Sequence, residues 1–149
     1  MVCPALKRRG ERKMNQLEQF MRISQGMKRS MSISDIELFK MLCYERKHTS
    51  IKSTENIIYI IFAFIIINYV ERTLIVCNHV DAIVLRRKAK KILNHDCGID
   101  SSLEICSSHE LNHKFNMYHS KKWNRIIYLK IDKISNWDLL ETTSEFMIM

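Results

Sequence analysis

Hydrophobic side chains recur at three- and four-residue intervals in three parts of the chain. The first part runs to about Arg29, the second from a capping box at 34–37 to about Arg46, and the third from Asp81 to Leu93. This spacing places apolar side chains on one face of a helix, so it predicts three amphipathic helices. Their apolar positions are Leu17, Phe20, Met21, Met27, Met31, Ile36, Phe39, Leu42, Cys43, Ala82, Leu85, Ala89 and Ile92.

The most apolar part of the chain is the segment Asn56–Val70, NIIYIIFAFIIINYV. As a helix it would span about 22 Å, which is less than the roughly 30 Å of a bilayer's hydrocarbon core. Three interpretations stay open, namely a membrane-inserted segment, a buried helix and a buried strand. Basic residues flank both ends, so the charge pattern gives no orientation across a membrane.

Strand patterns are short. The segment 73–77 is β-branched, and Ile127, Leu129 and Ile131 alternate with polar residues, which predicts at most a strand pair near 73–77 and 126–131. Only 3 glycines and 1 proline occur in the 149 residues, which makes an all-β fold improbable. We therefore expect a mostly α fold with a basic tail at 1–13 and one helix-rich domain at 14–149. A short last helix is expected near Ser135–Asp138.

Charge and cysteine content suggest partners and a compartment. The formal charge is +8, an excess that favours polyanions or anionic membrane surfaces. A non-specific polyanion site is expected on the basic side of the third helix, at Arg86, Arg87, Lys88, Lys90 and Lys91. Five irregularly spaced cysteines and the lack of an apolar N-terminal run predict an intracellular protein with reduced thiols and no cleaved signal peptide.

The clearest chemical motif is H-E-x-x-H, formed by His109, Glu110 and His113, with His119 six residues further on. We expect it on a helix at about 101–115, where residues four apart share a face and both imidazoles can reach one zinc ion. With His119 as third ligand, one coordination position stays open for water. Glu110 is then the candidate general base that deprotonates this water.

This stretch, HELNHKFNMYH, resembles the zinc-binding sequence of the metzincin metallopeptidases, H-E-x-x-H-x-x-G-x-x-H. Phe115 and Met117-Tyr118 are most like the adamalysin (reprolysin) branch. Upstream, 69–71 and 74–76 are similar to the first strand of the adamalysin catalytic domain. The two matches together cover about 25 residues.

The resemblance implies a zinc metalloendopeptidase with His109, His113 and His119 as ligands, Glu110 as base and a peptide as substrate. The sequence departs from the family at several positions. Asn116 replaces the glycine that turns the chain, although asparagine tolerates positive φ. No methionine lies between His119 and Met147 to form the family's methionine turn, and much of the catalytic domain is missing. A truncated or decayed metallopeptidase that holds zinc is therefore the leading hypothesis.

Other functions remain open. Cys97 and Cys106 with His109 and His113 would make a closed four-ligand zinc site. A non-enzymatic small basic protein is the alternative from another class, either an interaction protein or one associated with a membrane through Asn56–Val70. A recently arisen reading frame would have the same composition. No P-loop and no dinucleotide-binding glycine pattern is present in the sequence.

Overall fold

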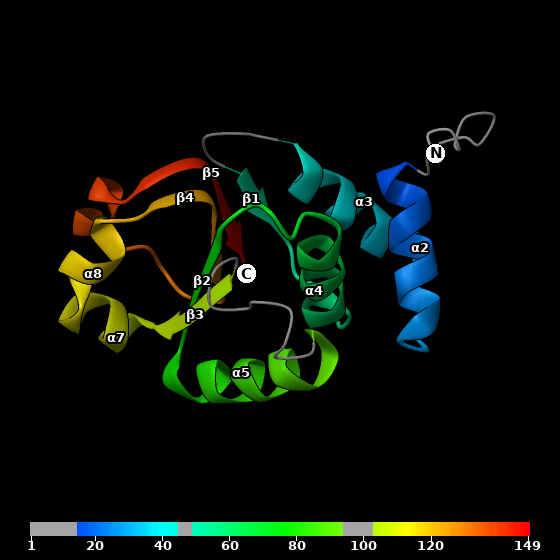
Figure 1. The fold of residues 1–149 in the computed structure, drawn as a ribbon, viewed down its shortest axis with the longest axis horizontal. Coiled ribbons are helices and arrows are strands. Elements are labelled where there is room, and N and C mark those ends of the chain that lie inside the picture. Colours follow the sequence, from blue (N-terminus) through cyan, green and yellow to red (C-terminus); the bar gives the residue numbers. More distant parts are fainter. Residues whose placement is uncertain (1–14, 45–48, 94–102) are drawn as a thin grey trace, which may run out of the picture.

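A five-stranded parallel β-sheet forms the centre of the molecule (Figure 1). This computed structural model describes residues 15–44, 49–93 and 103–149. The strands lie in the order β1-β5-β4-β2-β3, and each neighbouring pair is parallel. They are β1 (Thr49–Ile51), β2 (Thr73–Cys77), β3 (Leu103–Ser107), β4 (Lys122–Leu129) and β5 (Glu141–Ile148).

Four of the described helices lie on one face of this sheet. The helices α4 (Ile57–Ile67) and α5 (His79–Leu93) cover it directly. Two further helices, α2 (Gln16–Gly26) and α3 (Ile33–Cys43), pack against α4, and Figure 1 shows α2 on its outer side. The larger apolar core lies here, and it includes Phe20, Phe39, Ile60, Phe64, Ile75, Leu85, Ile127 and Phe146.

The opposite face is covered by shorter elements. These are α7 (Ser108–His113), α8 (Phe115–His119) and the 3-10 helix η2 (Ser135–Leu139). Their buried side chains Leu111, Tyr118 and Trp137 join sheet residues in a second, smaller core. The chain is therefore a three-layer α/β domain in which connections run over both faces.

The predicted mostly α fold is wrong. A central strand of a parallel sheet is buried on both faces, so it has a continuous apolar run in place of alternating apolar and polar residues. All five residues of β2 are buried, and its neighbours β3 and β4 are almost as fully buried. The predicted strand segments near 73–77 and 126–131 do lie in the sheet, but they belong to a five-stranded sheet and not to an isolated pair.

The predicted helix at about 101–115 is confirmed for the motif residues 108–113 and wrong for residues 103–107. Residues 103–107 form β3, and the helix begins only at Ser108 and ends at His113. The strand pairs in register with β2, from Leu103 beside Thr73 to Ser107 beside Cys77. This pairing buries the apolar side chains at 103, 105 and 106, which a helix would have distributed around its circumference.

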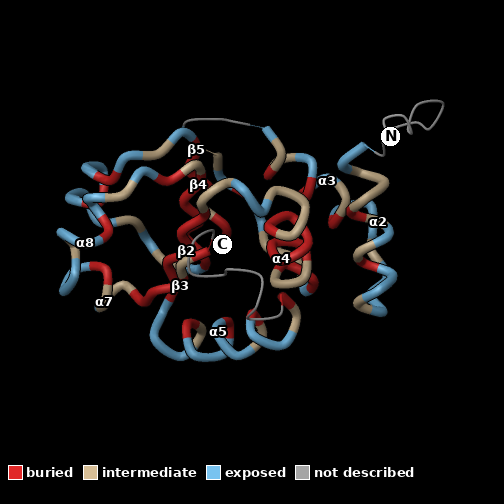
Figure 2. The backbone as a smooth tube through the Cα atoms, in the orientation of Figure 1, coloured by how far each residue is buried: buried red, intermediate tan, exposed pale blue. Residues whose placement is uncertain are grey.

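The apolar segment 56–70 forms α4, a helix of 11 residues that is buried along most of its length (Figure 2). Helices α2 and α3 and the sheet surround it, which explains why it is apolar on all sides. Within the described ranges 15–44, 49–93 and 103–149, no helix combines the length and apolar character needed to cross a membrane.

Two further predictions can be compared with the structure. The second helix begins with a capping box of Ser32 and Asp35, so its start lies just before the predicted 34–37 box. The short last helix is present as η2. The predicted basic tail at 1–13, the helix end at Arg46 and the candidate ligand Cys97 lie outside the described residues.

Candidate functional site

His109 and His113 lie side by side on the exposed face of α7. Their ring centroids are 5.9 Å apart and the ring planes differ by 11°. Both residues are exposed, so both imidazoles can reach solvent. The i, i+4 spacing of the sequence thus places the two imidazoles together, as predicted.

Glu110 does not sit free beside these histidines, because it forms the start of α7. Its carboxylate accepts a hydrogen bond from the Ser107 backbone N–H at 3.0 Å, and its own N–H donates to the Ser107 hydroxyl at 3.1 Å. Arg86 of α5 donates to both carboxylate oxygens, at 2.9 and 3.0 Å. Partial burial raises the pKa of Glu110, but the bonds from Ser107 and Arg86 outweigh it and hold the pKa below its usual value.

His119 is not brought to the other two histidines. Helix α7 ends at His113, α8 follows at once, and His119 stacks on Phe115 with ring centroids 5.5 Å apart. Among the described residues, no three or more histidine, cysteine or carboxylate side chains are grouped so that they could hold a metal ion. The three-histidine zinc set implied by the metzincin resemblance does not fit this geometry.

The four-ligand alternative has one of its two cysteines, Cys106, within the described residues. Cys106 is buried in β3, and burial raises the pKa of its thiol to about 12. A buried neutral thiol is a poor metal ligand, since the thiolate is the form that binds. Cys97 lies outside the described residues.

The carboxyl edge of the sheet is the second place where a site is expected. The connection after β2 runs over the α5 face towards β3, whereas the connection after β4 runs over the η2 face towards β5. The strands β2 and β4 are neighbours, and the connections that follow them run over opposite faces of the sheet. A crevice forms between two such strands, and doubly wound proteins bind ligands in it. A hollow of about 40 Å³ lies at this point, lined by Ile57, Ile58, Asp81, Val84, Leu85, Leu129 and Lys130.

Among the described residues, this edge of the sheet has no glycine-rich phosphate-binding loop. The connection between β1 and α4 contains Lys52 and Ser53 but no glycine, and Gly26 is the single glycine among the described residues. A phosphate-binding loop needs glycines so that several backbone N–H groups can point at the phosphates. Lys130, directly after β4, has a φ of 56°, so a lysine and not a glycine adopts the left-handed backbone conformation at this turn. The hollow is thus small, mostly apolar and without a phosphate loop.

Next to this hollow, positively charged side chains from distant segments meet at one tyrosine. Tyr59 lies in the first turn of α4, and its hydroxyl accepts a hydrogen bond of 2.7 Å from Arg29, which follows α2. The Arg29 guanidinium lies 4.0 Å and the Lys88 ammonium of α5 5.6 Å from the centre of the Tyr59 ring. Sequence reasoning singled out Lys88 but missed Tyr59 and Arg29, because only the tertiary fold brings the three together.

The five predicted polyanion-binding residues of α5 do not share one environment. Arg86 donates to the Ile105 carbonyl at 2.7 Å and pairs with Glu110, so its charge is already neutralised. Arg87, Lys90 and Lys91 are exposed and Lys88 is half-buried. None of these four forms an ion pair with an acidic side chain in the part of the chain that the structure describes.

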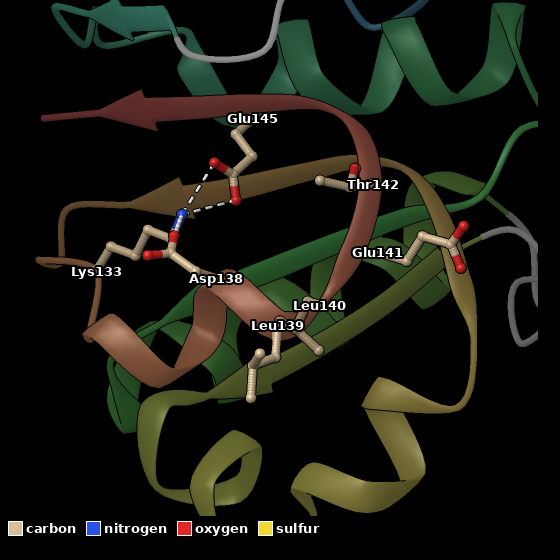
Figure 3. A pocket seen from close by; sticks show the side chains of 7 residues that line it. All are labelled: Lys133, Asp138, Leu139, Leu140, Glu141, Thr142 and Glu145. Carbon is tan, nitrogen blue, oxygen red and sulfur yellow. Dashed lines mark hydrogen bonds and ion pairs between the residues drawn. The ribbon is translucent and has the colours of Figure 1, made fainter.

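A larger hollow of about 540 Å³ lies on the other face, beside η2 and β5 (Figure 3). Lys133 and Glu145 point towards each other on its wall, with the Lys133 ammonium 2.9 Å from both carboxylate oxygens. Asp138 also pairs with Lys133, and Glu145 accepts a hydrogen bond from the Tyr128 hydroxyl at 3.5 Å. Each charge therefore has a partner within the cluster, and the cluster ties η2 to the sheet.

No protein-family model matches this chain, and no curated protein matches it either. The strand order and the connections over both faces of the sheet define a doubly wound α/β domain.

Proposed function

We propose that this chain is a non-catalytic binding domain that holds a polyanion, specifically the phosphate backbone of a nucleic acid, on the outer side of α5. Arg87, Lys88, Lys90 and Lys91 form this basic surface. The observation that carries the proposal is that, among the described residues, these four have no acidic partner, whereas the neighbouring Arg86 does. Positive side chains without counter-charges release the counterions of a polyanion when it binds.

The net charge and the sheet edge support the same function. A chain with a formal charge of +8 attracts polyanions from a distance and speeds their encounter. The carboxyl edge, where doubly wound enzymes place their catalytic groups, has no glycine loop among the described residues. Binding without turnover is the simplest activity of such a domain.

The test is the salt dependence of binding to a 20-base-pair DNA duplex. We expect Arg87→Ala/Lys91→Ala to lower the slope of log affinity against log salt by about 1.8, because each phosphate contact contributes roughly 0.9. The matched control is Lys114→Ala/Lys122→Ala, which removes two exposed charges at the α7–α8 junction and the start of β4. Equal slopes for the two variants, or no duplex binding by the wild-type protein, would contradict the proposal.

A second candidate function is zinc binding by His109 and His113 alone, which their ring separation of 5.9 Å favours. Two imidazoles and water would hold the ion at the surface. Peptide hydrolysis would require Glu110 to leave Ser107 and Arg86, so we propose metal binding without it.

Elemental analysis of the dialysed protein tests this second function. We expect up to one zinc per chain, lost in His109→Ala/His113→Ala and kept in His119→Ala. Zinc that survives the double substitution would rule out these two ligands, and zinc lost on His119→Ala would restore the three-histidine set.

A further inference from the structure

The Arg29 guanidinium and the Lys88 ammonium are held near the same aromatic ring although they come from different layers of the helical face. Arg29 lies in the connection between α2 and α3, and Lys88 lies in α5. The Arg29 Nη2 group donates to the Tyr59 hydroxyl at 2.7 Å, and both cations lie within 6 Å of the ring centre, at 4.0 and 5.6 Å. An aromatic face attracts each cation, but it does not neutralise either of them.

Both cations lie near the same ring, and the described surroundings supply no carboxylate to offset either of them. Glu55, the acid closest in sequence to Tyr59, is exposed and forms no ion pair within the described residues. A phosphate group that contacts both cations would supply the missing negative charge and accept charge-assisted hydrogen bonds from them. Arginine presents several N–H groups in a fixed fork, so donors remain after the one used by Tyr59.

The backbone holds Arg29 in place. Its N–H donates to the Ser24 carbonyl at 3.0 Å and closes the end of α2, where Lys28 has a φ of 58°. One residue later, the Ser30 carbonyl accepts a 3.1 Å hydrogen bond from the Asn56 side chain at the start of α4. This bond joins the α2–α3 connection to the helix that carries Tyr59. Both ends of the Arg29–Tyr59 contact are therefore fixed before any ligand arrives, which lowers the entropy lost on binding.

We propose that Arg29 and Lys88, positioned by Tyr59, form a phosphate-group site that binds one phosphodiester of the nucleic-acid backbone. This inference rests on the proposed function and extends it, because it adds a residue outside α5 and gives the basic surface a fixed anchor. Arg29 and Lys88 donate hydrogen bonds to non-bridging phosphate oxygens. The nucleic-acid backbone then continues along α5, past Arg87, Lys90 and Lys91.

Tyr59 supplies a spectroscopic reporter for this site. The hydrogen bond from Arg29, together with the positive charge of Lys88, lowers the pKa of the Tyr59 hydroxyl, and slight desolvation opposes this effect. A phosphate group beside the same two cations weakens their effect on the hydroxyl. Bound nucleic acid should therefore raise the pKa of Tyr59, which can be followed by NMR of the ring carbon in the full chain.

The experiment measures binding of a ten-residue oligothymidylate to the wild type, to Arg29→Gln/Lys88→Gln and to the control Lys114→Gln/Lys122→Gln. Glutamine keeps much of the side-chain length, and circular dichroism checks the fold of each variant. We expect the salt slope to fall by about 1.4 in the first variant, from roughly 0.7 for each lost contact, and to stay unchanged in the control. We also expect the pKa of Tyr59 to rise on addition of the oligonucleotide.

The outcomes separate this site from the wider proposal. If the wild type binds and the Arg29/Lys88 variant keeps the same salt slope and affinity, the phosphate site is overturned while polyanion binding by α5 survives. If the wild type binds no nucleic acid, both are overturned. A parallel titration with inorganic phosphate distinguishes the sources of the anion. If free phosphate raises the pKa of Tyr59 and the oligonucleotide does not, the nucleic-acid assignment is overturned.

Discussion

Arg125 is a charged residue placed in the apolar core. It lies within β4 with 4% of its surface exposed, and its guanidinium is 4.6 Å from the centre of the Phe64 ring. It pairs with Glu71 and donates to the Leu42 carbonyl at the end of α3. One side chain thus links β4 to α3, α4 and the segment before β2. Nothing in the strand pattern of 126–131 indicated this role, because it depends on three partners that are distant in sequence.

Replacing Arg125 by alanine should destabilise the fold by about 3 kcal/mol, since removal of one partner leaves a partly buried carboxylate and an unpaired carbonyl. Urea unfolding measures this change. Lys122→Ala, an exposed substitution on the same strand, should change stability by less than about 0.5 kcal/mol. Similar midpoints for the two variants would show that the Arg125 contacts contribute little.

At the level of elements, helices were easier to predict than strands. The periodic apolar residues and capping residues at 16–43 and 79–93 predicted helices that the structure contains, with small shifts at their ends. The segment 103–107 forms a strand where the sequence predicts a helix. Five residues are too few to show a periodic pattern of apolar positions, so the helical motif that follows extended the prediction over them. The candidate histidine pair followed from local spacing and lies together, whereas the Arg29–Tyr59–Lys88 group joins segments that no local pattern relates.

The capping box of α7 leads to a prediction about the stability of the fold. Ser107→Ala should lower the stability of the fold by about 1 kcal/mol because it removes the side-chain cap of the helix.

The pKa of Glu110 is lowered in the folded protein. The contribution of this carboxylate to stability is therefore fully present above the ordinary carboxyl pKa near 4.5, and it is lost as pH falls through the lower folded pKa. Glu110→Gln should therefore reduce the loss of stability on acidification. The midpoint of thermal unfolding measures this change between about pH 2 and about pH 7, a range that includes the usual carboxyl pKa values. An unchanged loss of stability on acidification would mean that Glu110 is not held by Ser107 and Arg86.

At the level of the whole molecule, the strand order could not be derived from the sequence. The low glycine and proline content correctly argued against an all-β fold, but a parallel sheet covered by helices needs few tight turns and is compatible with the same composition. Its strands are short apolar runs that resemble buried helix segments. Which run pairs with which is decided by long-range packing on two faces, and no local pattern contains that information.

The position of β1 at the edge of the sheet has a consequence for how the chain reaches this state. Thr49 pairs with Phe146 and Ile51 with Ile148, so one of the earliest strands in the chain is held by the last. During synthesis, β1 and the apolar helix α4 emerge from the ribosome long before β5 exists to complete their surroundings. Such non-local pairing gives a high contact order and slow folding. Until β5 arrives, the apolar core around α4 is incomplete, and in this interval aggregation or chaperone capture would compete with folding.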